Sequence, residues 1–228
     1  MKKAFDSIDI SILTEKLNYY GISGPYNELL KSYLTNRKIY TYLNDVQSHI
    51  LPINYGVPQG SVLGPLLFSL YINDIKNVCC NSEINLFADD TCLFCTADNY
   101  KQLEDKANET LQKCHNWLLR NRLTINIDKT HFLNFSKDSP TSNINLKLGN
   151  NPIVQKNDTN YLGIVLQDNL KWERHITNVI HKLNKQIPLY ISIKNALPLS
   201  KNSIIYKAIS FSLINYGIEL YSNKMLNG

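Results

Sequence analysis

The chain has 228 residues, of which 43% are hydrophobic and 19% are charged, and its formal net charge is +5. This length allows one domain or two small ones with a buried core, and the composition argues against a wholly disordered chain. The longest apolar stretch, residues 64–72, is too short to cross a bilayer, and no secretory signal precedes the first predicted helix. We therefore expect an intracellular protein, nuclear or cytoplasmic and not secreted, with no membrane partner and with its five cysteines as thiols.

The charges are divided unevenly along the chain. Residues 1–112 contain 9 Lys or Arg against 13 Asp or Glu, whereas residues 113–228 contain 15 against 6. A basic half attracts phosphates, so this division favours a nucleic acid as partner. Lysine-rich surfaces also occur simply because they are well solvated, and that interpretation stays open.

The first predicted helix is capped by Asp6 or Ser7 and runs to Tyr20, with Gly21 just past its end. Three more elements follow in order: a helix from Pro25 to about Tyr33, a strand at residues 39–43 and an apolar helix at residues 63–72.

A loop at residues 56–65, with three glycines and two prolines, precedes the apolar helix. Gln59 offers both a donor and an acceptor, and Gly60 lets a backbone approach a ligand closely. The loop lacks the Gly-Lys-Ser/Thr ending of a Walker phosphate-binding loop. Taken alone, it is a Gly/Pro turn before a core helix.

Residues 84–94 set two adjacent carboxylates, Asp89 and Asp90, between two apolar segments that favour strands. Apolar runs bounded by a turn are typical of buried strands, so we expect a hairpin with the aspartates at its tip. Neighbouring like charges are costly to bury unless a cation holds them, and Mg²⁺ is the common one. An isolated Asp-Asp pair is more often a solvated turn.

The rest of the chain predicts short strands and three helices, namely a helix at residues 100–119, strands at 131–135, 144–148 and 161–166, and amphipathic helices at 175–194 and 201–221. Pro198 separates the last two helices, and Pro188 is expected to kink the first of them. Cys92 and Cys95 could be half of a zinc site or a redox pair, but no second pair at metal spacing accompanies them, so structural burial is favoured.

The 56–65 loop followed by Phe87-Ala88-Asp89-Asp90 resembles the reverse transcriptases of non-LTR retrotransposons, the LINE and jockey-like elements. The resemblance covers essentially the whole chain. The remaining matching segments are residues 3–9 (end of the first catalytic motif), 32–38 (linker), 117–130 (motif with a catalytic-site lysine), 161–164 (primer-grip hairpin) and 170–176 (entry to the thumb).

The resemblance implies an α/β (α+β) fold. Residues 1–168 would form a reverse-transcriptase palm with a mixed sheet, the Asp-Asp hairpin and the primer-grip hairpin. Residues 169–228 would form the helical start of the thumb, and the fingers would be largely missing. It also implies RNA-directed DNA polymerase activity, in which two Mg²⁺ ions assist transfer of deoxynucleotides from their triphosphates to the 3′-hydroxyl of a DNA primer on an RNA template.

The resemblance assigns roles to particular residues. Asp89 and Asp90 would hold the metals, and Lys129 would protonate pyrophosphate. Phe5 would stack under the nucleotide sugar and exclude a 2′-hydroxyl, and Gln59 with Gly60 would shape the nucleotide pocket. The primer grip would be formed by Tyr161, Leu162 and Gly163.

For several residues a purely structural role stays open beside the role that the resemblance implies. Without the motifs, Phe5 would be a core aromatic residue and Lys129 a surface lysine. Arg120 and Arg122 could contact phosphates or equally lie at a helix end. Trp172 and His175 are expected to pack the hinge of the thumb rather than to touch substrate.

One departure from the family pattern concerns the first motif. The pattern places its metal-binding Asp four residues before Ala4, which is one residue before Met1. We therefore expect a truncated, catalytically incomplete copy. The alternative is a non-catalytic nucleic-acid-binding remnant. Another palm-type enzyme such as a nucleotide cyclase is less favoured, because cyclases need neither the 56–65 loop nor the Tyr161-Leu162-Gly163 hairpin.

Overall fold

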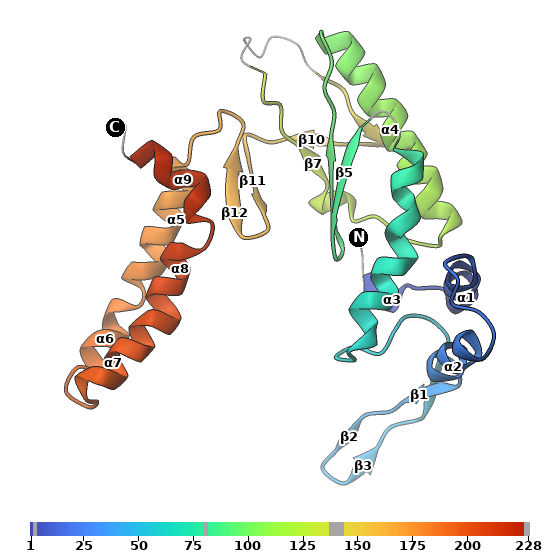
Figure 1. The fold of residues 1–228 in the computed structure, drawn as a ribbon, viewed down its shortest axis with the longest axis horizontal. Helices are drawn as coiled ribbons and strands as arrows, with labels where there is room; N and C mark the ends of the chain where they lie inside the picture. Colours follow the sequence, from blue (N-terminus) through green and yellow to red (C-terminus); the bar gives the residue numbers. More distant parts are fainter. Residues whose placement is uncertain (2–3, 80–81, 137–143, 226–228) are drawn as a thin grey trace. The chain divides into compact units, whose positions relative to one another are not determined.

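The computed structural model describes residues 1, 4–79, 82–136 and 144–225 (Figure 1). The chain forms two compact units, one of residues 1–131 with 141–154 and one of residues 132–140 with 155–228. The predicted boundary between a palm of residues 1–168 and a thumb segment of residues 169–228 is a boundary between functional parts, and it stays a prediction. Within the described ranges, no helix combines the length and the apolar character needed to cross a membrane.

The first unit opens with α1 (Ile10–Tyr19) and α2 (Pro25–Leu34), which pack against each other. The predicted cap at Asp6 or Ser7 is wrong, because Ala4–Asp6 form a short 3-10 turn and Asp9 caps α1. One carboxylate oxygen of Asp9 accepts from the backbone N–H groups of Ser11 at 2.9 Å and Ile12 at 3.1 Å. Asp9 directly precedes the helix, where its side chain reaches the free N–H groups of the first turn.

A narrow antiparallel arm follows α2 (Figure 1). It consists of two paired sets of strands, β1 (Arg37–Ile39) with β4 (Leu51–Ile53) and β2 (Tyr42–Leu43) with β3 (Val46–Gln47). The predicted strand at residues 39–43 is thus divided into β1 and β2. Most apolar side chains of the arm are exposed.

The helix α3 (Leu63–Ile72) has the predicted bounds, and η2 (Asn73–Val78) extends it as a 3-10 helix. Next come β5 (Glu83–Phe87) and β6 (Asp90–Phe94), which pair as the predicted hairpin, and α4 (Tyr100–Arg120), one residue longer than predicted. The core of the unit lies between α1, α3 and α4, and its fully buried side chains include Ile8, Leu13, Leu17, Leu34, Leu67, Phe68, Tyr71 and Ile75.

The described strands form two-stranded sheets, so the expected mixed sheet is not seen among them. Most strands have only two or three residues. Such short strands expose too few backbone groups along an edge to hold a further neighbour. The β5–β6 hairpin is longer, and it packs Ile84 and Leu86 against the core on one face while the alternate side chains of β5 stay exposed.

The first unit closes with η3 (Ile127–Lys129) and with the pair β8 (Lys147–Leu148) and β9 (Asn151–Pro152). Asn108 of α4 holds this pair, because its side chain donates to the Asn145 carbonyl and accepts from the Lys147 N–H, each at 2.9 Å. The predicted strands at 131–135 and 144–148 are shorter than expected. The first survives as β7 (His131–Phe132), which with β10 (Val154–Gln155) lies where the chain passes between the units.

The second unit begins with the hairpin of β11 (Asp158–Tyr161) and β12 (Ile164–Gln167). The predicted single strand at 161–166 is wrong, because Leu162 and Gly163 have positive φ angles of 49° and 81° and turn the chain. Helices then follow in the order α5 (Glu173–Asn184), α6 (Ile187–Ile193), α7 (Leu199–Tyr206), a π-helical turn (Lys207–Phe211), α8 (Ser212–Asn215) and α9 (Ile218–Met225).

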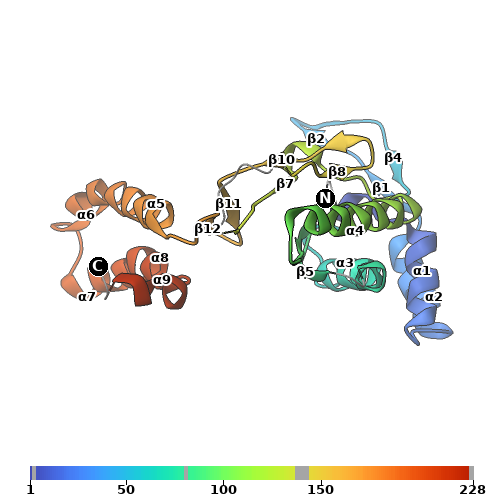
Figure 2. The same cartoon turned by 90° about the horizontal axis from the view of Figure 1, so that it is seen from above.

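Figure 2 shows α5 and α6 beside α7 to α9. The Tyr190 and Ser210 hydroxyls join the two layers at 2.6 Å. Pro188 breaks the first predicted helix rather than kinking it, because proline is accepted in the first turn of α6 but not in a helix interior. Gly217, with φ of 69°, follows the C-cap of α8 and interrupts the second predicted helix near its end.

The environment of the cysteines agrees with the prediction that they are structural thiols. The four described cysteines are free thiols, and Cys79 and Cys114 are buried with their sulfur atoms 3.0 Å apart. Cys92 and Cys95 are half-buried, and Cys95 contacts the Ser82 hydroxyl at 3.1 Å. Cys80 lies outside the described residues.

Candidate active site

Asp89 and Asp90 lie at the tip of the β5–β6 hairpin (Figure 1). Phe87 pairs with Asp90, so Ala88 and Asp89 form the two-residue turn, and both carboxylates are exposed. Ala88 has φ of 49°, a region in which a residue with a Cβ atom is strained. The amino group of Met1 donates to the backbone carbonyl of Asp89 at 3.0 Å, so this end of the chain lies against the turn.

The turn offers carboxylate oxygens, which are the ligands that Mg²⁺ prefers. Mg²⁺ is often held by one or two carboxylates together with water and substrate phosphates, and two exposed neighbouring aspartates fit that donor set. Across the described ranges, however, His, Cys, Asp and Glu side chains nowhere gather in threes to hold a metal ion. The hairpin tip therefore offers two carboxylates as candidate ligands.

The loop that carries Gln59 and Gly60 is fixed against the start of the chain. The backbone N–H of Gly56 donates to the Ile8 carbonyl at 2.8 Å, and that of Val57 donates to the Phe5 carbonyl at 2.9 Å. A Cβ atom on Gly56 would lie 2.7 Å from the Cα atom of Asp6, which is closer than atoms can approach. Glycine is thus required at position 56 by the approach of two backbones and by its φ of 76°.

Arg37 holds the other side of this loop. Its guanidinium donates to three backbone carbonyls, those of Leu34 at 2.9 Å, Tyr55 at 2.8 Å and Gly56. A planar guanidinium with several donors is suited to such a multiple contact. The sequence placed Arg37 in a linker motif but gave it no role. Nothing in its local pattern marked one, because its partners are backbone carbonyls.

Phe5 and Gln59 lie on the two segments that are joined at this junction. The Phe5 ring is half-buried and packs on Phe68 of α3 with ring centres 4.8 Å apart. The side-chain nitrogen of Gln59 donates to the Asp6 carboxylate at 2.8 Å. Gly60 is exposed with φ of 77°, and no heavy atom lies within 4 Å of the place where its Cβ would be. The structure thus brings the predicted residues Phe5, Gln59 and Gly60 together.

Lys129 lies at the end of η3 and is exposed. Within the described part of the chain it forms no ion pair with Asp89 or Asp90. Arg122 has a structural partner, because its guanidinium pairs with the buried carboxylate of Asp9 at 2.6 Å. That contact favours the structural interpretation of Arg122 over contact with phosphate.

The Asp9 carboxylate combines several interactions. Burial alone would raise its pKa, but the hydrogen bonds from Ser11 and Ile12 and the charge of Arg122 outweigh burial and leave the pKa of Asp9 lowered. Asp9 therefore stays ionised while it ties the start of α1 to the segment after α4. It is a structural carboxylate close in sequence to the candidate site.

The predicted primer-grip residues Tyr161, Leu162 and Gly163 lie in the second unit, at the turn between β11 and β12. Tyr216 packs on this turn, since its hydroxyl donates to the Leu162 carbonyl at 2.6 Å and its ring would lie 3.1 Å from a Cβ atom on Gly163. Sequence reasoning missed Tyr216, and nothing in its local pattern marked it.

His175 is buried, as the packing interpretation predicts. Its Nδ1 accepts from the Val165 N–H at 3.3 Å, and its ring lies 5.0 Å from that of Tyr221. Burial, with a smaller effect of the Lys182 charge, lowers the pKa of His175. The neutral imidazole thus joins α5 to β12.

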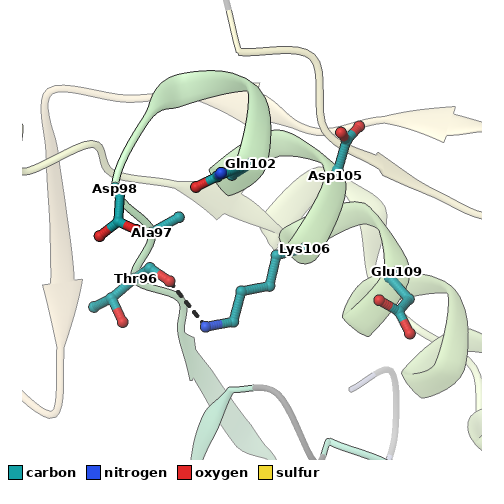
Figure 3. Close-up of a pocket in the computed structure, with 7 residues that line it drawn as sticks. All are labelled: Thr96, Ala97, Asp98, Gln102, Asp105, Lys106 and Glu109. Atoms are coloured by element: carbon teal, nitrogen blue, oxygen red, sulfur yellow. Dashed lines mark hydrogen bonds between the residues drawn. The ribbon is translucent and has the colours of Figure 1, made fainter.

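A separate pocket of about 590 Å³ lies between the loop after β6 and the first turns of α4 (Figure 3). Lys106 crosses it and donates to the Thr96 carbonyl at 2.8 Å. Its other lining residues are Ala97, Asp98, Gln102, Asp105 and Glu109. It contains none of the predicted site residues.

Comparison with known proteins places this geometry in context. Residues 1–166 match the family described as reverse transcriptase (RNA-dependent DNA polymerase). The chain is 28% identical over 228 residues to a probable RNA-directed DNA polymerase from transposon X-element of Drosophila melanogaster, covering 97% of this chain and 25% of that protein. It is 29% identical over 207 residues to the RNA-directed DNA polymerase from mobile element jockey of Drosophila funebris, covering 85% and 22%. The chain therefore spans about a quarter of the length of these relatives.

Proposed function

This chain belongs to the reverse transcriptase (RNA-dependent DNA polymerase) family, and we propose that its first unit forms the deoxynucleotide- and metal-binding part of an RNA-directed DNA polymerase of a LINE- or jockey-like non-LTR retrotransposon. The observation that supports this most is the junction at which the loop with Gln59 and Gly60 is fixed against Phe5 and Asp6. That junction belongs to the same compact unit as the Asp89–Asp90 turn.

In this proposal the substrates are an RNA template, a DNA primer and deoxynucleoside triphosphates. Phe5 forms the floor under the sugar of the incoming nucleotide, and its packing on Phe68 keeps the ring from moving away from a 2′-hydroxyl. Gln59 contributes amide donors and an acceptor to the pocket, and the open space at Gly60 lets the nucleotide lie close to the backbone.

Asp89 and Asp90 would hold Mg²⁺ through their carboxylates, and the exposed hairpin tip leaves room for a bound phosphate. Mg²⁺ bound there would lower the pKa of the primer 3′-hydroxyl and neutralise the triphosphate. Lys129 would supply a proton to the leaving pyrophosphate, a kind of acid catalysis worth about 10²–10⁴ in rate.

The remaining parts of the proposal concern the second unit. The turn of Tyr161, Leu162 and Gly163 would hold the primer strand, and residues 169–228 would serve as the start of the thumb, following a palm of residues 1–168. The firm docking of Tyr216 on the turn supports this role, because a grip on a primer needs a rigid backbone.

Primer extension tests the proposal. Residues 1–228 are placed in the corresponding segment of the jockey relative, and extension on an RNA template is measured with Mg²⁺ and deoxynucleotides. Asp89→Asn and Asp90→Asn should each abolish extension, whereas Asp98→Asn, an exposed carboxylate in the loop after β6, should not. Full extension by the Asp89→Asn protein would reject the assignment.

A second candidate function is nucleic-acid binding without catalysis. It is favoured by the absence of any three-residue metal cluster in the described ranges, together with the 15 basic against 6 acidic residues of positions 113–228. Residues 1–228 alone would then bind primer–template without extending it, and the affinity would fall steeply as salt rises because counterions are released. Salt-insensitive binding would contradict this candidate, and extension by residues 1–228 would show catalysis instead.

A further inference from the structure

We propose that Asp6 is a positioning residue that fixes which end of the Gln59 carboxamide faces the incoming deoxynucleotide. This inference rests on the proposed function, because Gln59 meets a nucleotide only if the first unit binds one. It concerns a residue to which sequence reasoning gave no role beyond a possible helix cap, a role that Asp9 fills instead.

The direction of the Gln59 side chain follows from the chemistry of its partner. An ionised carboxylate only accepts hydrogen bonds, whereas a carboxamide has one end that donates and one that accepts. The Asp6 carboxylate therefore binds the nitrogen end of Gln59, at 2.8 Å, and excludes the flipped amide. The Gln59 carbonyl oxygen then points away from Asp6 and is left as an acceptor for a hydroxyl group, such as that of a sugar.

The backbones that carry these two side chains are held in register independently. The Gly56 N–H to Ile8 bond and the Val57 N–H to Phe5 bond lie on either side of Asp6 in the sequence. The missing side chain at Gly56 lets the loop come within contact distance of the Asp6 backbone. Since backbone hydrogen bonds already hold the loop in place, the bond between Asp6 and Gln59 sets a side-chain orientation rather than the position of the loop.

The small energy of the bond supports the same role. Both side chains are exposed, and hydrogen bonds between exposed groups contribute little to the stability of a fold. Arg37 also fixes the start of the loop, because it donates to the Tyr55 and Gly56 carbonyls. Loss of Asp6 should therefore leave the fold intact and release only the amide of Gln59.

The first measurement follows the side-chain NH₂ group of Gln59 by nuclear magnetic resonance in ¹⁵N-labelled residues 1–228 without nucleotide. The signal is assigned by its loss in Gln59→Ala. We expect one downfield-shifted proton in the wild-type protein, collapse of that shift in Asp6→Ala, and partial retention in Asp6→Asn, whose carbonyl can still accept. Asp98→Ala is the matched control. An unchanged Gln59 signal in Asp6→Ala would overturn the inference.

The second measurement is a double-mutant cycle for the binding of deoxyguanosine triphosphate with Mg²⁺ to the same proteins. Asp6→Ala should weaken binding about fivefold, as expected for loss of one charge-assisted hydrogen bond at an exposed site. In Asp6→Ala/Gln59→Ala the loss should equal that of Gln59→Ala alone, since Asp6 acts through Gln59. Additive losses would overturn the inference. If the wild-type protein binds no deoxyguanosine triphosphate, the proposed function and the nucleotide part of the inference both fail, while the NH₂ signal still decides whether Asp6 orients Gln59.

Discussion

The Lys16 ammonium of α1 lies 2.5 Å from a carboxylate oxygen of Asp74, in the first turn of η2 just after α3. The ammonium also donates to the Tyr71 carbonyl at 2.7 Å and lies 4.7 Å from the ring centre of Trp117 in α4. Trp117 completes the network, since its indole N–H donates to the other Asp74 oxygen at 3.2 Å. One half-buried charge pair thus joins three helical segments of the first unit.

The first prediction concerns the contribution of Lys16 to stability. Lys16→Ala should lower the free energy of unfolding by about 1–3 kcal/mol, because it leaves Asp74 partly buried without its cation and removes packing on Trp117. Lys16→Met, which keeps most of the packing, should cost less. Urea denaturation measures both. The control is Lys113→Ala, which disrupts an exposed pair with Glu109 one helical turn away and should cost at most about 0.5 kcal/mol. Equal losses at both positions would contradict the role given to Lys16.

Burial lowers the pKa of Lys16, although the hydrogen bond and charge of Asp74 act to raise it. A cation whose folded-state pKa is lowered loses stability as pH falls below its unfolded value, near 10.5. The pair contributes to the fold by satisfying the Asp74 carboxylate and the Tyr71 carbonyl, to both of which the Lys16 side chain donates.

The second prediction concerns the need for glycine at position 56. Gly56→Ala should lower the free energy of unfolding by at least about 2 kcal/mol, because its Cβ atom would meet the backbone of Asp6 at 2.7 Å and because φ is 76°. The matched control is Gly21→Ala, where φ is 87° but no heavy atom lies within 4 Å of the added Cβ. That substitution should cost only the backbone strain, about 1–2 kcal/mol. Thermal unfolding of both proteins gives the comparison, and a smaller loss at Gly56 than at Gly21 would be inconsistent with the close approach.

The accuracy of the sequence-based fold prediction depends on the kind of signal. The bounds of α3 and the β5–β6 hairpin were predictable because apolar runs and a turn mark them locally. The cap of α1 was not, because Asp6, Ser7 and Asp9 are all good caps and only the place where the helix begins selects Asp9. At Leu162 the residue pattern predicted one strand through the turn, because a positive φ is imposed on an ordinary leucine only in the folded hairpin, whereas the family resemblance predicted a hairpin at residues 161–164.

In the candidate site, too, some residues could be predicted from the sequence and others could not. Motif spacing identified Phe5, Gln59 and Gly60, and the fold brings them together. Arg37 and Tyr216 escaped notice because their contacts are with backbone carbonyls, namely those of Gly56 and Leu162 among others. Any residue type can present such a carbonyl, so a single sequence carries no trace of these contacts.

The third prediction is that the stability contributed by His175 depends on pH. Burial lowers its pKa, so the folded state binds this proton more weakly than the unfolded state, whose ordinary value is 6.5. The stability contributed by neutral His175 should be fully present above pH 6.5 and should decrease as the pH falls below it. The positive charge of Lys182 also disfavours a protonated imidazole, and the ring packs on the neutral ring of Tyr221.

Hydrogen exchange of α5 measures this effect between pH 5 and 8. Exchange of the α5 amides, corrected for the intrinsic effect of pH, should become less protected below pH 6.5 in the wild-type protein. His175→Asn keeps an acceptor for the Val165 N–H and cannot be protonated, so its protection should vary little over this range. His49→Asn, on the exposed arm, is the control and should behave like the wild type. A pH dependence that persists unchanged in His175→Asn would assign it to another group.

The last prediction concerns the contact between Met1 and Asp89. The Met1 amino group donates to the Asp89 carbonyl at 3.0 Å, so a residue attached directly before Met1 would lie beside the Asp89–Asp90 turn. The resemblance to the family predicts a metal-binding aspartate at that position, four residues before Ala4. Adding one aspartate before Met1 should therefore tighten binding of Mn²⁺ by about tenfold, since a third carboxylate joins the two at the hairpin tip. An added asparagine, which extends the backbone equally without the charge, should produce no such gain, and Asp90→Asn should cancel the gain from the aspartate. Relaxation enhancement of water protons by bound Mn²⁺ reports the affinity directly. Equal affinities for the aspartate and asparagine extensions would show that the chain before Met1 does not approach the two carboxylates.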